Sequence, residues 1–458
     1  MNNTDVNSCI NAVELNSEDR HLIGELITIW RNKLTNNIKR NAYYSDRVGV
    51  KNIGIAVDDK YRSRIKTDIG WAAKAVDMVA ERSIFDGFVC DDESLNAIIK
   101  KNDFAYSYEL ALTSVLIYSC GFWTVTAGET APVIRFYNAE NGSAIWDWDK
   151  KQIRAGLVIT DWEYNNNMYT PACVVVHKTN EIITLRKEKN SWHAYKQTHN
   201  IGRPLIEAMT NKPSDSRPFG KSVISKTVMA ITDEMKREIL RCSLHSELYT
   251  SPAKYVLGVA NLSKETAEQV KRLFKTNEIF VAERDENGQI PQIGQLNAQS
   301  MTAHTEIMQN LAKRMSAEAS IPLNSLGIIH DNPSSAEALK ASMEDLIQKC
   351  EKLNRTNSKT LKNIARLTLA VNTLQPVDNI TEDVDVCFKN PATVSMAAVA
   401  DAMTKQANVI PWIAETDVFL ESLGYSDSQR ARLKKEKAKA EAESRMQGSQ
   451  VPAFNNEN

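Results

Sequence analysis

Residues 334–374 carry the sequence SSAEALKASMEDLIQKCEKLNRTNSKTLKNIARLTLAVNTL, which contains the longest helical pattern in the chain. Its apolar residues recur at intervals of three and four, the period of one helical face. They are Ala336, Leu339, Met343, Leu346, Cys350, Leu353, Leu361, Ile364, Leu367 and Val371, with a polar interruption over 354–360. Ser334 and Glu337 have the spacing of a capping box at its start. At about 1.5 Å per residue, a helix over 335–374 is about 60 Å long, so it must project from a domain or form its spine.

Two more helices are predicted before this segment. The first ends at Ser251-Pro252 and the second at Ile321-Pro322, because the residue before a proline is biased away from helical geometry. The apolar face of the first helix comprises Ile224, Val228, Ile231, Met235, Ile239 and Cys242, and that of the second comprises Met301, His304, Met308, Leu311 and Met315. Acidic and basic residues are interleaved on the first helix, which is typical either of a solvated surface or of ion pairs with neighbouring subunits.

Residues 251–296 form a compact insert between these two helices. Strands are predicted at Lys254–Leu257 and Ile279–Glu283, a short helix at Lys264–Phe274, and another strand after the turn at Asn287-Gly288. The sequence therefore predicts a helical hairpin with a small β-rich knob at its tip.

Length and composition are those of an ordinary globular protein with two or three hydrophobic cores. The chain has 458 residues, of which 42% are hydrophobic and 25% charged. Its 56 basic and 57 acidic residues give a net charge of −1, so no overall basic field attracts it to nucleic acid. Seven cysteines without a CxxC pair indicate reduced thiols in a cytosolic compartment. The first residues have neither the basic nor the apolar run of a signal peptide.

The first 120 residues are predicted to be mainly helical. Residues 1–16 are polar, and we expect them to be disordered. Ser17 is the expected N-cap of a helix that ends at Tyr43-Tyr44. Further helices are expected near residues 69–81, 94–101 and 106–119.

From Gly121 to Ile206 the apolar period changes to two, which predicts a β module. Its strands are expected at Phe122–Thr126, Val133–Tyr137, Ile153–Asp161, Ala172–His177 and Glu181–Leu185, with a hairpin turn at Asn141-Gly142. No helices alternate with these strands, so the fold class is α+β, mainly helical, with an antiparallel sheet. The uncharged stretch Leu110–Gly128 fits a buried helix leading into a strand better than a membrane span.

Short helices are predicted for the C-terminal part of the chain, after a brief extended segment. They cover Val394–Gln406, Asp417–Leu423 and Asp427–Met446, and the last one is dense in charged residues. The polar residues 447–458 are expected to be disordered.

Motifs for catalysis, cofactors or metals are missing, including the P-loop, GxGxxG, HExxH and GxSxG patterns. Asp147 and Asp149 would lie on one face of a strand, the smallest arrangement that holds Mg²⁺ in a nuclease, but no third acid has a clear place beside them. His193 and His199 are better explained as surface residues than as metal ligands. We therefore predict no catalytic, cofactor or metal site.

Several short segments, taken in order, make the chain resemble the portal (head-to-tail connector) proteins of tailed bacteriophages, of the siphophage type. The segments are Tyr43-Tyr44, Ala80-Glu81-Arg82 before Gly87-Phe88, Tyr118–Gly121, Arg203-Pro204-Leu205, Phe219-Gly220-Lys221-Ser222, Glu247–Pro252, Ile321–Gly327, Asn332–Leu339 and Leu420–Gly424. Each is of moderate specificity, and their order over nearly the whole chain carries the resemblance. Ser45 and Cys120 depart from the residues that are commoner in that family.

The resemblance implies a ring of about twelve subunits at one capsid vertex, with double-stranded DNA passing through its centre. Its regions would be a wing (17–210), a first stem helix (211–250), a clip (251–297), a second stem helix (298–320), a tunnel loop (321–334), a spine helix in the wing (335–374) and a crown (375–446), with disordered ends at 1–16 and 447–458. The implied partners are the terminase large subunit, an adaptor or head-completion protein, and the major capsid and scaffolding proteins. The implied location is the head–tail vertex of the virion, and the host cytoplasm during assembly.

The same resemblance suggests three sets of site residues. The DNA-channel loop would expose Leu323, Asn324, Ser325, His330, Asp331 and Asn332. Contacts between stem helices of neighbouring subunits would involve Lys226, Glu234, Arg237, Glu238 and Arg241. The clip would present Lys264, Lys271, Arg272, Lys275 and Arg284 to the terminase and the adaptor.

Two other interpretations remain open at this point. A helical adaptor or scaffold of small oligomeric state would bind one partner through residues 335–374. A metal-dependent nucleic-acid enzyme would use Asp147, Asp149 and a distant acid, and would cleave only with Mg²⁺.

Overall fold

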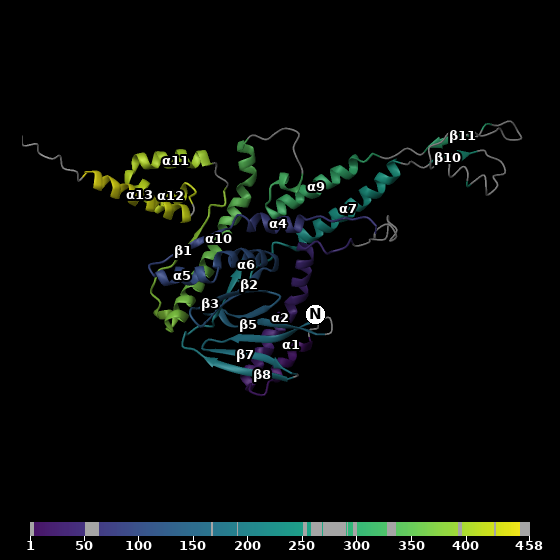
Figure 1. Cartoon of the computed structure of the whole chain (residues 1–458). Helices are drawn as coiled ribbons and strands as arrows, with labels where there is room; N and C mark the ends of the chain where they lie inside the picture. The colour runs from purple at the N-terminus through teal and green to yellow at the C-terminus, as the bar shows by residue number, and fades with distance from the viewer. Residues whose placement is uncertain are drawn as a thin grey trace, which may run out of the picture. The chain divides into compact units, whose positions relative to one another are not determined.

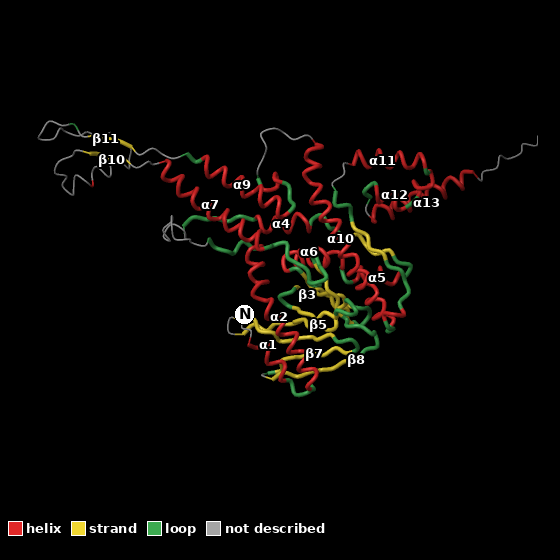
Figure 2. Tube along the Cα trace, turned by 180° about the vertical axis from the view of Figure 1, so that it is seen from behind, coloured by secondary structure: helices red, strands yellow, loops and turns green. Residues whose placement is uncertain are grey.

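The computed structural model describes residues 4–50, 64–165, 168–189, 191–250, 254–257, 268, 290, 292–295, 300–327, 336–392, 396–425 and 427–448. The chain divides into two units, Met1–Pro391 and Ala392–Asn458, and each is described by itself. Figure 1 labels the elements along the chain, and Figure 2 separates helices from strands as seen from behind.

The long N-terminal helix α2 (Ser17–Tyr44) has the predicted bounds, but its N-cap is Asn16 and not Ser17. The Asn16 side chain accepts a hydrogen bond from the Asp19 N–H at 2.7 Å. The prediction that residues 1–16 are disordered is wrong for the part described, where α1 (Thr4–Ser8) and the 3₁₀ turn η1 (Cys9–Asn11) precede α2. This segment is ordered because every third residue is apolar and buried against α2 and the larger sheet. These residues are Val6, Cys9, Ala12 and Leu15.

Helices α4 (Trp71–Ala80), α5 (Glu93–Lys101) and α6 (Phe104–Tyr118) confirm the predicted helices within two residues at most bounds. Helix α6 leads directly into strand β2 (Cys120–Thr126), as expected for the uncharged stretch Leu110–Gly128. Among the helices that the structure describes, none has the length and apolar composition needed to cross a bilayer.

The β module confirms the antiparallel prediction but consists of two sheets. A three-stranded sheet has the order β3-β2-β9, and a five-stranded sheet has the order β4-β5-β6-β7-β8. Their bounds are β3 Val133–Asn138, β9 Ile206–Thr210, β4 Gly142–Asp147, β5 Gln152–Asn165, β6 Met168–His177, β7 Glu181–Glu188 and β8 Ser191–Thr198. Strands β4, β8 and β9 were not predicted. Helix α2 packs on one face of the larger sheet (Figure 1).

The hairpin predicted at Asn141-Gly142 is wrong, because this turn carries the chain from one sheet to the other. Strand β3 pairs with β2, whereas β4 begins at Gly142 and pairs with β5. A Cβ at Gly142 would lie 2.7 Å from the ring of Phe122 and 3.3 Å from the carbonyl of Leu157. The glycine is therefore required by close packing between the sheets rather than by turn geometry.

Helices α7 (Lys226–Thr250) and α9 (Thr302–Ala319) lie side by side, and we call them the stem helices (Figures 1 and 2). Strands β10 (Lys254–Leu257) and β11 (Gln292–Gln295) pair between them in the chain, as predicted for the start and end of the knob. Of the helix and strand predicted over 264–283, only Glu268 is described, and it is helical; the rest lies outside the described residues.

The first stem helix begins later than the predicted region 211–250, because residues 211–225 form a loop. Gly220 has a φ of +69°, and a Cβ there would lie 2.1 Å from the carbonyl oxygen of Asn211. Asn211 also accepts the N–H of Lys221 at 2.8 Å and donates its side-chain amide to the Lys221 carbonyl at 2.7 Å. These bonds satisfy the backbone outside a helix, and the Ser225 hydroxyl then accepts the Val228 N–H at the helix start.

The spine helix α10 (Ala336–Thr373) confirms the predicted long helix, and its apolar seam from Leu346 to Val371 is buried. The polar stretch 354–360 does not interrupt this seam. Asn354 contacts the Ser83 hydroxyl, Asn357 donates to the Tyr108 hydroxyl at 3.2 Å, and Thr360 donates to the Ala208 carbonyl at 3.2 Å. All three are buried, so the seam continues here through hydrogen bonds instead of apolar contacts.

The boundary predicted at residue 375 for the C-terminal region is too early. After α10 the chain forms the 3₁₀ turn η3 (Val377–Asn379) and the strand β12 (Asp385–Phe388), which pairs with β1 (Phe85–Val89). These residues belong to the first unit, and the second unit begins at Ala392. The second unit contains the predicted helices as α11 (Met396–Val409), α12 (Asp417–Ser422) and α13 (Asp427–Gly448), with η4 (Pro411–Glu415) after α11.

Candidate functional site: the stem helices, the following loop and the spine

Polar contacts set the antiparallel alignment of the stem helices. The Ser225 hydroxyl donates to Glu318 at 2.8 Å, and further along α7 the Glu234 carboxylate pairs with Arg314 at 2.9 Å. Besides these polar contacts, the two helices contribute buried apolar residues to the main core, among them Ile231, Met235, Leu311 and Met315. The stem is therefore a packed helical hairpin within one chain.

Glu238 is the most buried acid of this hairpin, with 3% of its surface exposed. One of its oxygens lies 2.5 Å from Nδ1 of His304 on α9, and the other lies 3.4 Å from Arg241 on its own helix. Nε2 of His304 in turn lies 2.9 Å from Nδ1 of His245 on α7. An acid and two imidazoles therefore form a continuous chain of hydrogen bonds across the stem.

The five residues predicted to contact a neighbouring subunit take different places. Within the chain, Glu234 pairs with Arg314 and Glu238 pairs with His304. Arg241 forms a second, longer contact with Glu238. Lys226 is exposed at the start of α7, and Arg237 is half-buried. Of this set, Lys226 and Arg241 are exposed, as a contact with another subunit would require.

A second group, which the sequence did not single out, anchors α7 to the rest of the unit. Lys236 is buried, donates to the Val48 carbonyl at 2.7 Å and pairs with Asp46. The Tyr43 hydroxyl lies 2.9 Å from both oxygens of Asp233, and burial together with this carboxylate raises the pKa of Tyr43. In the sequence, Lys236 and Asp233 look like surface charges of a mixed helix. Only the packing of α2 and the residues after it against α7 shows that they are anchoring residues.

The loop that follows α9 is described up to Gly327. Ser320 adopts left-handed geometry with a φ of +55°, and the short helix η2 (Leu323–Leu326) follows the buried residues Ile321 and Pro322. Of the predicted channel residues, Leu323 packs against the main core, Ser325 is half-buried and Asn324 is exposed. His330, Asp331 and Asn332 lie outside the described residues.

Lys349 connects this loop to the spine helix. Its ammonium group donates to the carbonyl of Ala319, the last residue of α9, at 2.6 Å. A cation at this position satisfies a free carbonyl and the negative end of the helix dipole. Burial, with a smaller effect of nearby Lys212, lowers the pKa of Lys349 to about 8.

The five basic residues predicted for the clip, Lys264, Lys271, Arg272, Lys275 and Arg284, all lie outside the described residues. The strand pair β10 and β11 shows where their segment leaves and rejoins the described chain: Leu257 pairs with Gln292, and Lys254 pairs with Gln295.

Asp147 and Asp149 are explained by the turn between β4 and β5. The Asp147 side chain accepts the N–H groups of Asp149 and Lys150, both at 3.0 Å, and so stabilises the turn. His193 pairs with Glu14 at 3.1 Å, and Nδ1 of His199 accepts the Ile201 N–H. Within the described ranges, no three His, Cys, Asp or Glu side chains are placed to hold a metal ion.

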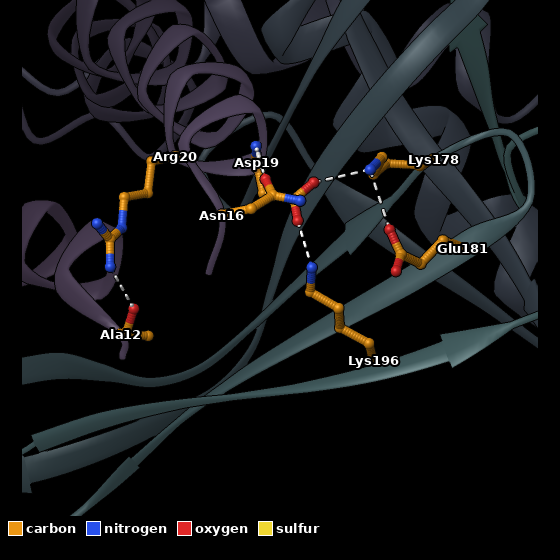
Figure 3. Close-up of polar contacts among 7 residues, drawn as sticks. All are labelled: Ala12, Asn16, Asp19, Arg20, Lys178, Glu181 and Lys196. Atoms are coloured by element: carbon orange, nitrogen blue, oxygen red, sulfur yellow. Dashed lines mark hydrogen bonds and ion pairs between the residues drawn. The ribbon is translucent and has the colours of Figure 1, made fainter. Parts of the chain in front are cut away.

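A buried ion cluster ties α2 to the larger sheet, and sequence reasoning missed it (Figure 3). Asp19, only 1% exposed, accepts from Lys178 at 2.7 Å and from Lys196, and Lys178 also contacts Glu181 at 2.9 Å. Burial alone would raise the pKa of Asp19, but the two lysines outweigh it and hold that pKa below its usual value. This cluster orients the helix that leads to the stem anchor at Tyr43.

A β module, a helical hairpin with a strand pair between its helices, and a long spine helix follow one another in this chain. This is the order that the resemblance to head-to-tail connectors predicted. The chain belongs to the family described as phage portal protein, SPP1 Gp6-like, whose model matches residues 23–445.

Two curated relatives and two solved structures illustrate what this chain is similar to. The portal proteins of Mycobacterium phages D29 and L5 are each 22% identical to it over 435 residues, which cover 90% of this chain and 87% of theirs. Among solved structures, a chain from the virion of a native gene transfer agent particle is 12% identical with a TM-score of 0.43, covering 87% of this chain and 98% of that one. A chain from the neck of that particle, computed with C12 symmetry, is 11% identical with a TM-score of 0.44, covering 85% and 99%.

Proposed function

We propose that this portal protein assembles into a ring of about twelve copies at one capsid vertex and conducts double-stranded DNA during packaging and ejection. The observation that carries the proposal is the family match over residues 23–445, which includes the stem helices and the spine helix. The role is structural rather than enzymatic. The ring would occupy the head–tail vertex of the virion, after assembly in the host cytoplasm.

The regions of the chain have separate tasks in this proposal. The stem helices and the loop after α9 border the channel, with Asn324 as the exposed channel residue of the described loop and residues 330–332 as further candidates. The segment between β10 and β11 is the clip, which meets the terminase large subunit and later the adaptor or head-completion protein. The second unit, from Ala392, is the crown, and the capsid and scaffolding proteins contact the wing.

The balance of charges supports a conduit rather than a DNA-binding protein. A net charge of −1 gives no overall attraction for a polyanion, so DNA can slide without being held. Exposed polar side chains such as Asn324 agree with transient contacts.

The experiment is the native mass of the purified chain, followed by negative-stain images of the same sample. We expect rings of about twelve copies with a central hole, formed by the chain alone or after coexpression with its scaffolding protein. A stable dimer that buries α10, under both conditions, would contradict the proposal and favour the adaptor interpretation.

A further inference from the structure

The exposed side of the spine helix is strongly basic, although the whole chain is nearly neutral. Residues 352–373 contain five cations and no acid. Lys352, Arg355 and Lys359 recur at intervals of three and four, so they share one helical face, and all three are exposed.

A groove of about 650 Å³ separates this helical face from the β4–β5 turn, whose residues Trp148, Lys150 and Lys151 line the groove together with Lys359. Trp148 is 60% exposed, and Lys150 and Lys151 are exposed beside it. We call these six residues the basic face: Trp148, Lys150, Lys151, Lys352, Arg355 and Lys359.

Acids inside the chain offset only part of the charge of the basic face. Glu207, which lines the groove, is held by Arg203 at 3.0 Å and by the Asn363 amide at 2.7 Å. None of the five cations of the basic face forms an ion pair with another residue in the described part of the chain. The exposed acids Asp149 and Asp215 lie nearby, which leaves an excess of positive charge.

A complementary acidic face lies where β1 ends and β12 begins. Val89 pairs with Asp385, so the residues that follow Val89 run beside those that precede Asp385. Asp91, Asp92 and Glu93 follow Val89, and Asp383 lies two residues before Asp385. We call Val89 and these four acids the acidic face. Val89 is 61% exposed, and the segments 89–93 and 381–385 contain no cation. Lys362 forms an ion pair with Asp385 at 2.5 Å, and Asp385 is not part of the acidic face.

We propose that the basic face of one subunit docks on the acidic face of the next copy of this chain; this rests on the ring proposed above. Both faces belong to the first unit, and a ring is built by such head-to-tail contacts between two different faces. The basic face has the exposed apolar side chain of Trp148 among its positive charges, and the acidic face has that of Val89 among its negative charges. Apolar centres within complementary charged rims are the usual anatomy of a protein interface.

Nucleic acid is a less suitable occupant of the basic face. Phosphate groups would pair with the lysines but would leave the Trp148 indole and the groove prolines Pro213 and Pro218 without an apolar partner. A second copy of the chain satisfies both the charges and the apolar side chains.

The test exchanges the charges of the two faces. The first variant carries Lys150→Glu and Lys359→Glu, the second carries Asp91→Lys and Asp383→Lys, and a control carries Lys33→Glu and Lys39→Glu on exposed positions of α2. Native mass and circular dichroism are measured at low salt for each variant, for the chain with both faces exchanged, and for a mixture of the two variants.

We expect each single-face variant to fold but to need about tenfold or more protein for assembly, because like charges then meet at every contact. The mixture should form rings in which the two variants alternate in equal numbers, and the chain with both faces exchanged should assemble alone. The control should assemble like the wild type.

Three results would overturn the docking proposal. They are unchanged assembly of both single-face variants, failure of the mixture to form alternating rings, and a control that assembles as poorly as the variants. If instead Lys150→Glu with Lys359→Glu assembles normally but loses salt-dependent binding of a DNA duplex, the basic face binds nucleic acid and the docking proposal fails. A wild-type chain that forms no ring contradicts the proposed function itself, whereas unaffected variants in an intact ring contradict only the docking.

Discussion

Nδ1 of His304 lies 2.5 Å from the carboxylate of Glu238, and this contact joins the two stem helices at the buried Glu238 side chain. A buried carboxylate is costly unless donors satisfy it, and here His304 is the nearest donor. The same imidazole also reaches His245 on α7. The stem therefore contains a buried polar contact that neither helix could form alone.

Replacing His304 by leucine should reduce the free energy of unfolding by about 1–3 kcal/mol, because the buried Glu238 loses its closest hydrogen-bond donor. Chemical denaturation measures the loss, and deuterium exchange should show faster exchange in α7 and α9. The matched control is Arg314→Ala, which removes the largely exposed pair with Glu234 and should cost at most about 1 kcal/mol. Equal losses for the two variants would contradict a special role for His304.

Tyr108→Phe should reduce the free energy of unfolding by about 1–3 kcal/mol, because it leaves buried polar groups of the spine without a partner. The Tyr108 hydroxyl lies 3.2 Å from both the Ser83 hydroxyl and the Asn357 amide. Tyr106→Phe on the same helix is the control, since Tyr106 is 58% exposed and should tolerate the change within about 0.5 kcal/mol. Urea denaturation distinguishes them, and a neutral Tyr108→Phe would show that the polar stretch of the spine is not stabilising.

Asp19→Asn should lower the free energy of unfolding at pH 7 by about 1–3 kcal/mol, because Lys178 and Lys196 lose their shared carboxylate. The folded-state pKa of Asp19 is lowered, so its stabilisation is present above the usual carboxyl pKa of about 4 and is lost as the pH falls through the folded value. The difference between wild type and variant should therefore shrink in acid.

Denaturation at pH 7 and pH 3 measures this pH dependence of the Asp19 cluster. Glu25→Gln serves as the control, because its pair with Arg154 is exposed on both sides and should contribute at most about 1 kcal/mol. A constant difference between wild type and Asp19→Asn at both pH values would rule out the ionised cluster as the source of stability.

Lys349→Met should change the pH dependence of stability in the alkaline range. The folded pKa of Lys349 is about 8, below the usual lysine value of about 10.4, because burial disfavours its charge. The unfolded chain thus binds more protons between these values, and this lysine makes the wild type more stable as the pH rises through them. The wild type should gain stability relative to Lys349→Met between pH 7 and pH 10, whereas the exposed Lys352→Met should follow the wild type. Parallel curves for all three proteins would show that Lys349 keeps its usual pKa.

Much of the architecture could be predicted from local sequence. The three-and-four spacing of apolar residues determined α10 and the C-terminal helices to within a few residues, and alternation placed most strands. Prolines at 252 and 322 marked where the two stem helices end. Helix and strand positions depend mainly on residues that are close together in the sequence, within a few helical turns or one strand.

The candidate site was only partly predictable, because its contacts join residues that are distant in the sequence. The sequence placed the stem helices and the loop after α9, but it assigned Glu234 and Glu238 to contacts between subunits, whereas Arg314 and His304 of the same chain hold them. Channel residues 330–332 and the clip residues remain predictions.

What the sequence by itself determined is the order of elements and the faces they bury. Only the tertiary structure decided the pairing of β1 with β12, about 300 residues apart, and the change of sheet at Gly142. The same holds for the burial of the polar stretch 354–360 and for the packing of residues 4–15 on α2. The physical reason is that periodicity records which side of an element is covered, whereas the partner that covers it is chosen by packing and hydrogen bonding among segments distant in the chain.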